Sequence, residues 1–238
     1  DFTESSNYSE YDLVYQRMEW SVDPAIKYIA GSVTSYFKSL VEELNEIEFD
    51  LNSEMIVDSV KQKDARLDYT HSNNKLLISL ENALTKDKVD SVQVYYKGEP
   101  DKKNEEIFSV TYHSGVPVLW TLSEPYGAME WWPCKQSLID KIDSIDVIVT
   151  CPDAYKTASN GILVSDVVES GLRKMHWKHR YPIVTYLVAI AVTNYADYSD
   201  TLRFDDGRTM PILNYVYPEY LAKAKIESPN TAKVMKIF

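Results

Sequence analysis

The 238-residue sequence has few of the residues on which common catalytic motifs depend. Its seven glycines leave little material for a glycine-rich phosphate loop, and it has no Gly-x-Ser-x-Gly nucleophile motif. None of its four histidines is followed by glutamate, so these residues contain no His-Glu-x-x-His zinc motif. His176 and His179 lie in a segment that alternates like a strand, where residues three apart point to opposite sides. A catalytic pair of carboxylates like that of glycosidases is the one site of this kind that the sequence does not exclude, because acidic residues are plentiful.

Cysteine and basic residues are also scarce. Two cysteines, Cys134 and Cys151, are too few for a disulfide framework, and we expect both to be free thiols. The net charge of -11 argues against nucleic acid and against anionic membrane surfaces as partners. The longest apolar run, residues 183–192, is far shorter than the ~20 residues that cross a bilayer. We therefore expect neither a nucleic-acid partner nor a membrane span.

Strand-forming segments are abundant. Many segments alternate with a period of two, are rich in tyrosine, valine, isoleucine and threonine, and are separated by Asp, Asn, Gly and Pro at short intervals. These segments are residues 12–22, 25–40, 46–52, 55–63, 65–72, 75–81, 89–98, 106–115, 117–123, 142–152, 155–170, 172–180 and 183–192. The pattern predicts a mainly β fold, an antiparallel β-sandwich.

The pattern changes after about Pro211. Pro218 stands near a helix start, and Ser228 with Pro229 reads as an N-cap followed by a first-turn proline. We expect short C-terminal helices here. Because an apolar helical face runs to Phe238, we also expect the sequence to be the front portion of a longer protein.

Five short signatures occur in a fixed order. They are "YYKGEP" at residues 95–100, Trp132-Pro133-Cys134, Lys141, "VIVTCPDAYKTASNGIL" at residues 147–163, and "YLVAIAVTNY" at residues 186–195. In this order and spacing the sequence resembles the N-terminal domain of the aminopeptidase N and leukotriene-hydrolase family of zinc metallopeptidases (gluzincin aminopeptidases). The likeness runs from Tyr11 to Tyr195, with a weaker tail to Phe238.

The sequence departs from the family pattern in two places. The family continues its Pro-Cys with an aromatic residue and Asp-Glu-Pro, whereas here Lys135-Gln136-Ser137-Leu138 follow. Met129 stands where the family commonly has arginine. These departures concern the local loop and leave the expected fold unchanged.

The resemblance implies two domains and a function for each of them. Residues 1–216 would form a saddle-shaped, mainly antiparallel N-terminal β-sandwich, and residues 217–238 would begin a thermolysin-like catalytic domain. The family's zinc, held by two histidines and a glutamate, would activate water, with a second glutamate as base and a tyrosine at the oxyanion. All of these would lie beyond Phe238. The intact protein would be a zinc-dependent aminopeptidase, a hydrolase that removes N-terminal residues from peptides, whereas this fragment would lack catalytic and metal-binding residues and be inactive.

The resemblance gives one residue of this chain a role. Glu124 stands ten residues before Cys134, where family members place a Gln or Glu that accepts a hydrogen bond from the substrate's α-ammonium group. The family has a cis peptide at this place, and because a cis bond before proline costs only ~0.5–1 kcal/mol, we expect Glu124-Pro125 to be cis. The expected partners are thus a peptide substrate and the chain's own catalytic domain.

One local likeness is interpreted as accidental. Residues 127–130, "GAME", match four fifths of the family's Gly-Ala-Met-Glu-Asn loop, but that loop lies in the catalytic domain, and Trp131 replaces its final Asn here.

Two further questions stay open from sequence. An alternative function is a non-catalytic β-sandwich scaffold that binds peptides or carbohydrates through Trp120, Trp131, Trp132 and Tyr126. The acidic surface and the polar start favour a secreted location, periplasmic or extracellular, and a cytoplasmic one stays an alternative.

Overall fold

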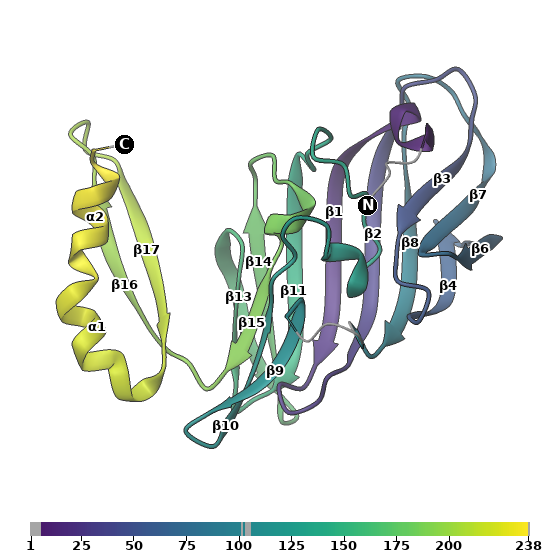
Figure 1. Cartoon of the computed structure of the whole chain (residues 1–238). Coiled ribbons are helices and arrows are strands. Elements are labelled where there is room, and N and C mark those ends of the chain that lie inside the picture. The colour runs from purple at the N-terminus through teal and green to yellow at the C-terminus, as the bar shows by residue number, and fades with distance from the viewer. Residues whose placement is uncertain (1–5, 101, 103–105, 238) are drawn as a thin grey trace.

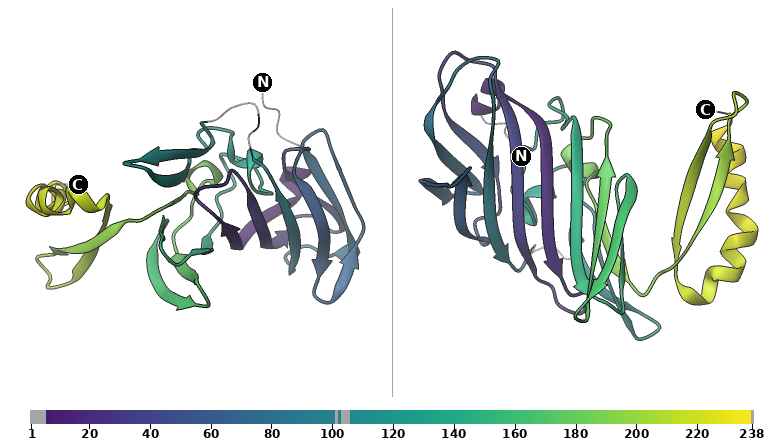
Figure 2. Two further views of the ribbon diagram at one scale, coloured as in Figure 1. Left: turned by 90° about the horizontal axis from the view of Figure 1, so that it is seen from below. Right: turned by 180° about the vertical axis from the view of Figure 1, so that it is seen from behind.

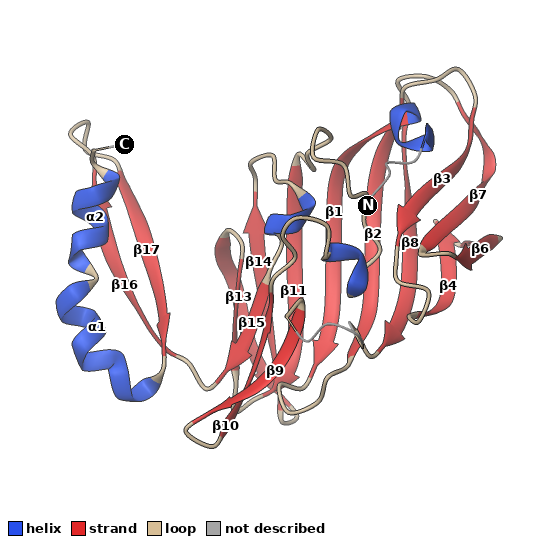
Figure 3. Cartoon of the chain, viewed as in Figure 1, coloured by secondary structure: helices blue, strands red, loops and turns tan. Residues whose placement is uncertain are grey.

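The computed structural model describes residues 6–100, 102 and 106–237, and strands predominate in it (Figure 3). Its largest element is an eight-stranded sheet in the order β13-β14-β11-β1-β2-β8-β4-β5. Its strands are β1 (Tyr11–Val22), β2 (Ile29–Ser39), β4 (Ile56–Gln62), β5 (Ala65–Leu67), β8 (Val89–Gly98), β11 (Ser144–Pro152), β13 (Ile162–Glu169) and β14 (Leu172–His179).

Two smaller sheets and three short 3-10 helices cover one face of this large sheet (Figures 1 and 2). The four-stranded sheet consists of β12 (Lys156–Ser159), β15 (Ile190–Thr193), β10 (Val116–Thr121) and β9 (Phe108–His113). The three-stranded sheet consists of β3 (Leu44–Asp50), β7 (Lys75–Leu84) and β6 (Tyr69–Ser72). The 3-10 helices are η1 (Ser6–Glu10), η2 (Ala128–Glu130) and η3 (Thr185–Leu187). The expected mainly β sandwich is confirmed.

The core lies between these layers because the long strands alternate. In β1, Leu13, Met18 and Trp20 point inward and are almost fully buried. They pack with the inward residues of the neighbouring strands and of the covering sheets in one continuous hydrophobic cluster. One pairing in the sheet is parallel, between β1 and β11. Parallel neighbours need a long connection, and here more than a hundred residues separate the two strands in the chain.

Gly31 is the point of closest backbone approach in the large sheet. It pairs with Trp20, and a Cβ atom added at this position would lie 1.9 Å from the carbonyl oxygen of Glu19. No side-chain rotation relieves a clash with backbone. We expect Gly31→Ala to lower the free energy of unfolding by about 1–3 kcal/mol, read from urea unfolding. Thr34→Ala on the same strand is the control and should cost less; equal costs would show that the close approach is relaxed in solution.

The last part of the chain differs from the expected pattern. β16 (Ala196–Arg203) and β17 (Thr209–Val216) form a two-stranded sheet that is not among the expected strands, and β17 continues through Pro211. A two-stranded hairpin tolerates this proline because both of its strands are edges. The segment 183–192, expected to be one strand, is a strand only from Ile190 onward, after the 3-10 turn η3.

Two short helices follow the hairpin after the 3-10 turn η4 (Pro218–Tyr220). They are α1 (Leu221–Glu227) and α2 (Pro229–Met235), so the expected C-terminal helices are confirmed. Ser228 does not cap α2 as expected; its hydroxyl donates a hydrogen bond to the Asp200 carboxylate at 2.5 Å instead. The hairpin and helices lie at one end of the molecule, opposite the three-stranded sheet (Figure 1). No helix of the described residues is long and apolar enough to cross a membrane.

Candidate functional site

The loop that carries Glu124 connects β10 to η2 on the covered side of the large sheet. The side chains of Glu124, Pro125 and Tyr126 are exposed, whereas the preceding Ser123 is only 2% exposed and the following Gly127 is buried. The peptide bond between Glu124 and Pro125 is cis. Glu124 therefore stands on a short exposed turn with buried residues on both sides.

Hydrogen bonds fix both ends of this turn. The Gly127 amide donates to the Ser123 carbonyl at 2.8 Å, and the Trp131 indole donates to the Ser123 hydroxyl at 2.9 Å. Trp131 is itself fully buried, with its ring 4.8 Å from that of Trp20 on β1. The turn is thus attached directly to the main hydrophobic core.

A chain of buried donors completes the attachment. The Trp20 indole donates to the Tyr96 hydroxyl at 2.8 Å, and that hydroxyl donates to the Trp131 carbonyl at 2.9 Å. Because Trp20 lies on β1 and Tyr96 on β8, the Glu124 turn is held against two strands of the large sheet.

The segment after the turn pairs with the end of β3. Asp50 and Cys134 exchange backbone hydrogen bonds at 2.7 and 3.0 Å, and the Asn52 amide donates to the Met129 carbonyl at 2.8 Å. The Asn52 side chain also donates to the Glu130 carboxylate. Glu130, the acidic residue of the "GAME" segment, therefore has a structural partner within this domain.

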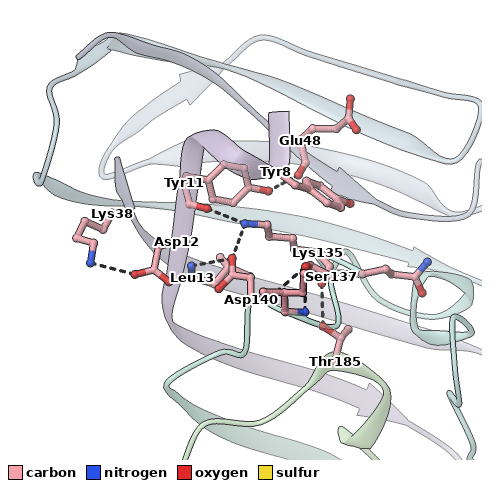
Figure 4. Close-up of polar contacts among 12 residues, drawn as sticks. Tyr8, Tyr11, Asp12, Leu13, Lys38, Glu48, Lys135, Ser137, Asp140 and Thr185 are labelled. Carbon is pink, nitrogen blue, oxygen red and sulfur yellow. Dashed lines mark hydrogen bonds and ion pairs between the residues drawn. The ribbon is translucent and has the colours of Figure 1, made fainter. Parts of the chain in front are cut away.

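Lys135 is the most unusual residue near the site, because it is a lysine that is only 2% exposed. Its ammonium donates to the Tyr11 carbonyl at 2.6 Å and pairs with the Asp140 carboxylate (Figure 4). The same nitrogen lies 4.2 Å from the centre of the Tyr11 ring. The Thr185 hydroxyl donates to the Lys135 carbonyl at 2.8 Å. Where the sequence departs from the family pattern, it thus supplies a buried cation that ties the loop to β1 and η3.

Burial shapes the acidity of the groups around this loop. It raises the pKa of the Asp140 carboxyl above its ordinary value, and the Lys135 ammonium opposes that rise. Burial also raises the pKa of the Cys134 thiol well above its ordinary value, with the charge of Asp50 adding to the effect. For Cys151, burial raises the pKa to about 11. Both cysteines are buried free thiols and stay protonated at neutral pH, so neither supplies a thiolate nucleophile.

The described residues contain no group of three or more His, Cys, Asp or Glu side chains that could hold a metal ion. His176 and His179 lie on opposite faces of β14, and the His176 ring is hydrogen-bonded to Asp146 at 2.7 Å. The residues present do not fit a zinc ion.

The rings considered for a binding scaffold do not form one surface. Trp131 and Trp132 are fully buried, and both pack against Trp20. Burial against the core makes Trp131 and Trp132 inaccessible, so these two rings cannot serve the alternative function of binding sugars or peptides; Trp120 is half-buried and Tyr126 exposed.

Sequence reasoning identified Glu124 but missed the residues that hold its turn in place. Asn52 and Tyr96 hydrogen-bond to the segment that follows the turn, and they come from two distant parts of the chain. Spacing within the sequence carries no signal for such contacts, because they form only when β3, β8 and the loop come together. The role of Glu124 itself stays a prediction.

Comparisons with known proteins identify relatives of this architecture. The family model described as the peptidase M1 N-terminal domain matches residues 6–187. Among solved structures, an M1 zinc metallopeptidase mutant from Deinococcus radiodurans superimposes with a TM-score of 0.77 at 20% identity, covering 87% of this chain and 47% of that one. The same mutant in complex with a Tyr-Ser-Ala substrate gives a TM-score of 0.76 at 20% identity, over 90% of this chain and 51% of that one. The native leukotriene A4 hydrolase of Saccharomyces cerevisiae gives 0.73 at 19% identity, over 93% of this chain and 34% of that one.

At these identities the structural matches show the fold. The chain spans about half the length of the Deinococcus structures and about a third of the yeast one. No curated protein gives a significant match.

Proposed function

Because the chain belongs to the peptidase M1 N-terminal domain family, we propose that it forms one wall of the substrate cleft of a zinc-dependent aminopeptidase. In this proposal residues 1–216 are the N-terminal β-domain and residues 217–238 begin the catalytic domain. The observation that carries the proposal is the Glu124 turn, where an exposed carboxylate stands between buried neighbours that are hydrogen-bonded to the core.

This geometry suits recognition of a charged chain end. An exopeptidase must distinguish the free α-ammonium of a peptide from the uncharged amides along it. A carboxylate held in place accepts charge-assisted hydrogen bonds from an ammonium group, which are about twice as strong as neutral ones. A rigid support increases the gain, because little side-chain and loop entropy is lost on binding. The substrate class is therefore peptides with a free N-terminus.

The domain contributes binding and orientation, and the hydrolytic chemistry lies elsewhere. The described residues contain no group of three or more side chains that could hold zinc, and we assign the zinc ion to the catalytic domain, where it would supply the activated water of the family's reaction. The isolated 238-residue chain should accordingly show no peptidase activity.

Metal removal tests whether zinc belongs to the catalytic domain alone. In the complete protein, 1,10-phenanthroline should abolish hydrolysis of an aminoacyl-p-nitroanilide, and added zinc should restore it. In the 238-residue chain the same chelator should leave the melting temperature unchanged, because the described residues contain no metal site. Hydrolysis by the 238-residue chain alone, or a chelator-sensitive melting temperature, would contradict the proposal.

A further inference from the structure

The two smaller sheets leave the other face of the eight-stranded sheet uncovered, as the view from behind shows (Figure 2, right). We call it the outer face. Cross-strand pairing arranges its outward side chains in rows that run from β14 to β4. One row contains Lys178, Asp146, Arg17, Thr34, Gln93 and Lys61; the next contains His176, Ile148, Glu19, Ser32, Tyr95 and Ser59; a third contains Lys174, Thr150, Ser21, Ala30, Lys97 and Ile56. We call these three rows the outer rows.

The outer rows are basic although the chain as a whole carries a net charge of -11. Lysine and arginine outnumber aspartate and glutamate in them. The acidic side chains on this face are engaged: Glu19 pairs with Arg17, and Asp146 pairs with Arg180 at 2.5 Å. Lys97 in turn pairs with Asp58, which lies beside the rows, at 2.8 Å.

Three lysines keep their charge available. Within the part of the chain that the structure describes, Lys61, Lys174 and Lys178 have no carboxylate within ion-pair distance. Lys174 and Lys178 lie about 13 Å apart along β14, and Lys61 lies five strands away, at about 24 Å. Charges spread over such distances fit an extended polyanion rather than a single small anion.

A shallow groove crosses the same face. It has a volume of about 410 Å³, and small residues, including Ser21, Ala30 and Ser32, line it. Lys174 and Tyr95 also line it. So do two carboxylates, Glu19 and Asp58, and each is neutralised by an ion pair, with Arg17 and Lys97 respectively. A pair of tyrosines adjoins the outer rows: Tyr15 and Tyr36 face each other across β1 and β2 with ring centres 5.5 Å apart, and Tyr36 is 40% exposed. The face thus combines apolar ring surfaces with hydroxyl and amide groups, such as Gln93, which donates to the Ser32 hydroxyl at 3.1 Å.

Other occupants fit this face less well. A peptide adds to a sheet through the free backbone groups of an edge strand, whereas β1, β2, β8 and β11 are central strands with neighbours on both sides. Duplex nucleic acid carries about one negative charge per 1.7 Å, a higher density than three lysines spread over this face can match. Sugar rings, in contrast, present apolar faces to tyrosine and hydroxyl groups to serine, threonine and glutamine. From the lysines, the tyrosines and the groove together, we infer that the outer rows bind an anionic polysaccharide, a chain of sugars that carry carboxylates.

Titration calorimetry of the 238-residue chain with a galacturonic acid hexamer tests this inference. Binding should be detectable at low ionic strength and weaken as salt is added, because the contacts to the exposed lysines are screened. The double substitution Lys174→Ala with Lys178→Ala should weaken binding about tenfold, since two charge-assisted contacts are lost. The matched control removes two lysines from the helices, Lys223→Ala with Lys233→Ala, and should change the affinity less than about twofold.

Two further measurements distinguish specific binding of a sugar chain from nonspecific binding of anions to a basic surface. Tyr36→Ser should weaken binding of the hexamer about threefold or more, and Tyr36→Phe should preserve it, because the ring surface is what contacts the sugar. A glutamate hexapeptide of equal charge should bind at least about tenfold more weakly than the sugar. Equal affinity for the two hexamers, an unchanged affinity in the Lys174 and Lys178 double variant, or no binding of the sugar at low salt would overturn the inference. A circular dichroism melt of each variant keeps loss of binding distinct from loss of folding.

Discussion

Replacement of Lys135 with methionine is expected to lower the free energy of unfolding by about 3–5 kcal/mol, the largest effect of any single substitution at the Glu124 loop. Methionine fills a similar volume but supplies no charge, so the Asp140 carboxylate loses its ion-pair partner. The Tyr11 carbonyl loses a hydrogen-bond donor at the same time. Urea unfolding of the purified chain measures the change.

The loss should depend on pH in a defined direction. The pKa of Asp140 is raised in the folded state, so the folded state binds this proton more tightly than the unfolded state does. The contribution of Asp140 to stability is therefore fully present below its unfolded pKa and is lost as the pH rises through its folded pKa. Without Lys135 the folded pKa rises further, and the deficit of the variant should be smaller near about pH 4 than at neutral pH.

Two controls test the origin of the effect. Lys141→Met removes an exposed lysine that lines a pocket together with Lys135 and Asp140, and it should change stability by no more than about 0.5 kcal/mol. The double substitution Lys135→Met with Asp140→Leu removes both charges and should recover most of the loss. If the double variant is less stable than Lys135→Met, the ion pair is not the source of the effect.

Under the proposed function, Glu124→Ala in the full-length protein should raise the KM for free-amino substrates by about 10- to 100-fold, equivalent to about 1.4–2.8 kcal/mol of lost binding. The loss arises because the substrate's ammonium group no longer meets a carboxylate. Glu124→Gln keeps a hydrogen-bond acceptor without the charge, so its KM should lie between those of the wild type and the alanine variant. Initial-rate kinetics with an aminoacyl-p-nitroanilide at saturating zinc measure all three proteins.

Two controls test whether a change in KM comes from Glu124 itself and not from the loss of any glutamate or from misfolding. Glu169→Ala removes an exposed glutamate from the end of β13 and should leave the KM unchanged. A melt of the Glu124→Ala variant should coincide with that of the wild type, because the Glu124 side chain is exposed and the anchors of its turn lie on Ser123, Gly127 and Trp131. Equal KM values for wild type and Glu124→Ala would refute the assigned role.

The sequence predicts the secondary structure of this protein well where neighbouring residues along the chain determine it. Alternation in residues 12–22 and 89–98 indicates β1 and β8, because inward positions must be apolar in a sheet with one covered face. The two C-terminal helices were similarly evident from Pro218 and Pro229. The hairpin of β16 and β17 was missed, since Pro211 and the charged residues of that segment weaken the strand pattern.

In the candidate site, contacts between residues distant in sequence could not be predicted. The family resemblance selects Glu124, ten residues before Cys134, and its side chain is exposed; its role in binding stays a prediction. The parallel pairing of β1 with β11, the burial of Lys135 and the anchoring of the turn by Tyr96 join residues far apart in sequence. No local pattern encodes these contacts, because each depends on which surfaces the completed sandwich brings together.

The proposed role of Glu124 is tested most directly by measuring how the full-length protein binds two aminopeptidase inhibitors that differ only in the α-amino group. Calorimetry should show that the wild type binds the amino compound at least about tenfold more tightly than its desamino analogue. The account predicts that Glu124→Ala brings the two affinities to within about twofold, with the desamino compound binding as in the wild type. If the preference for the amino compound is as large in Glu124→Ala as in the wild type, another group recognises the chain end and the account is wrong.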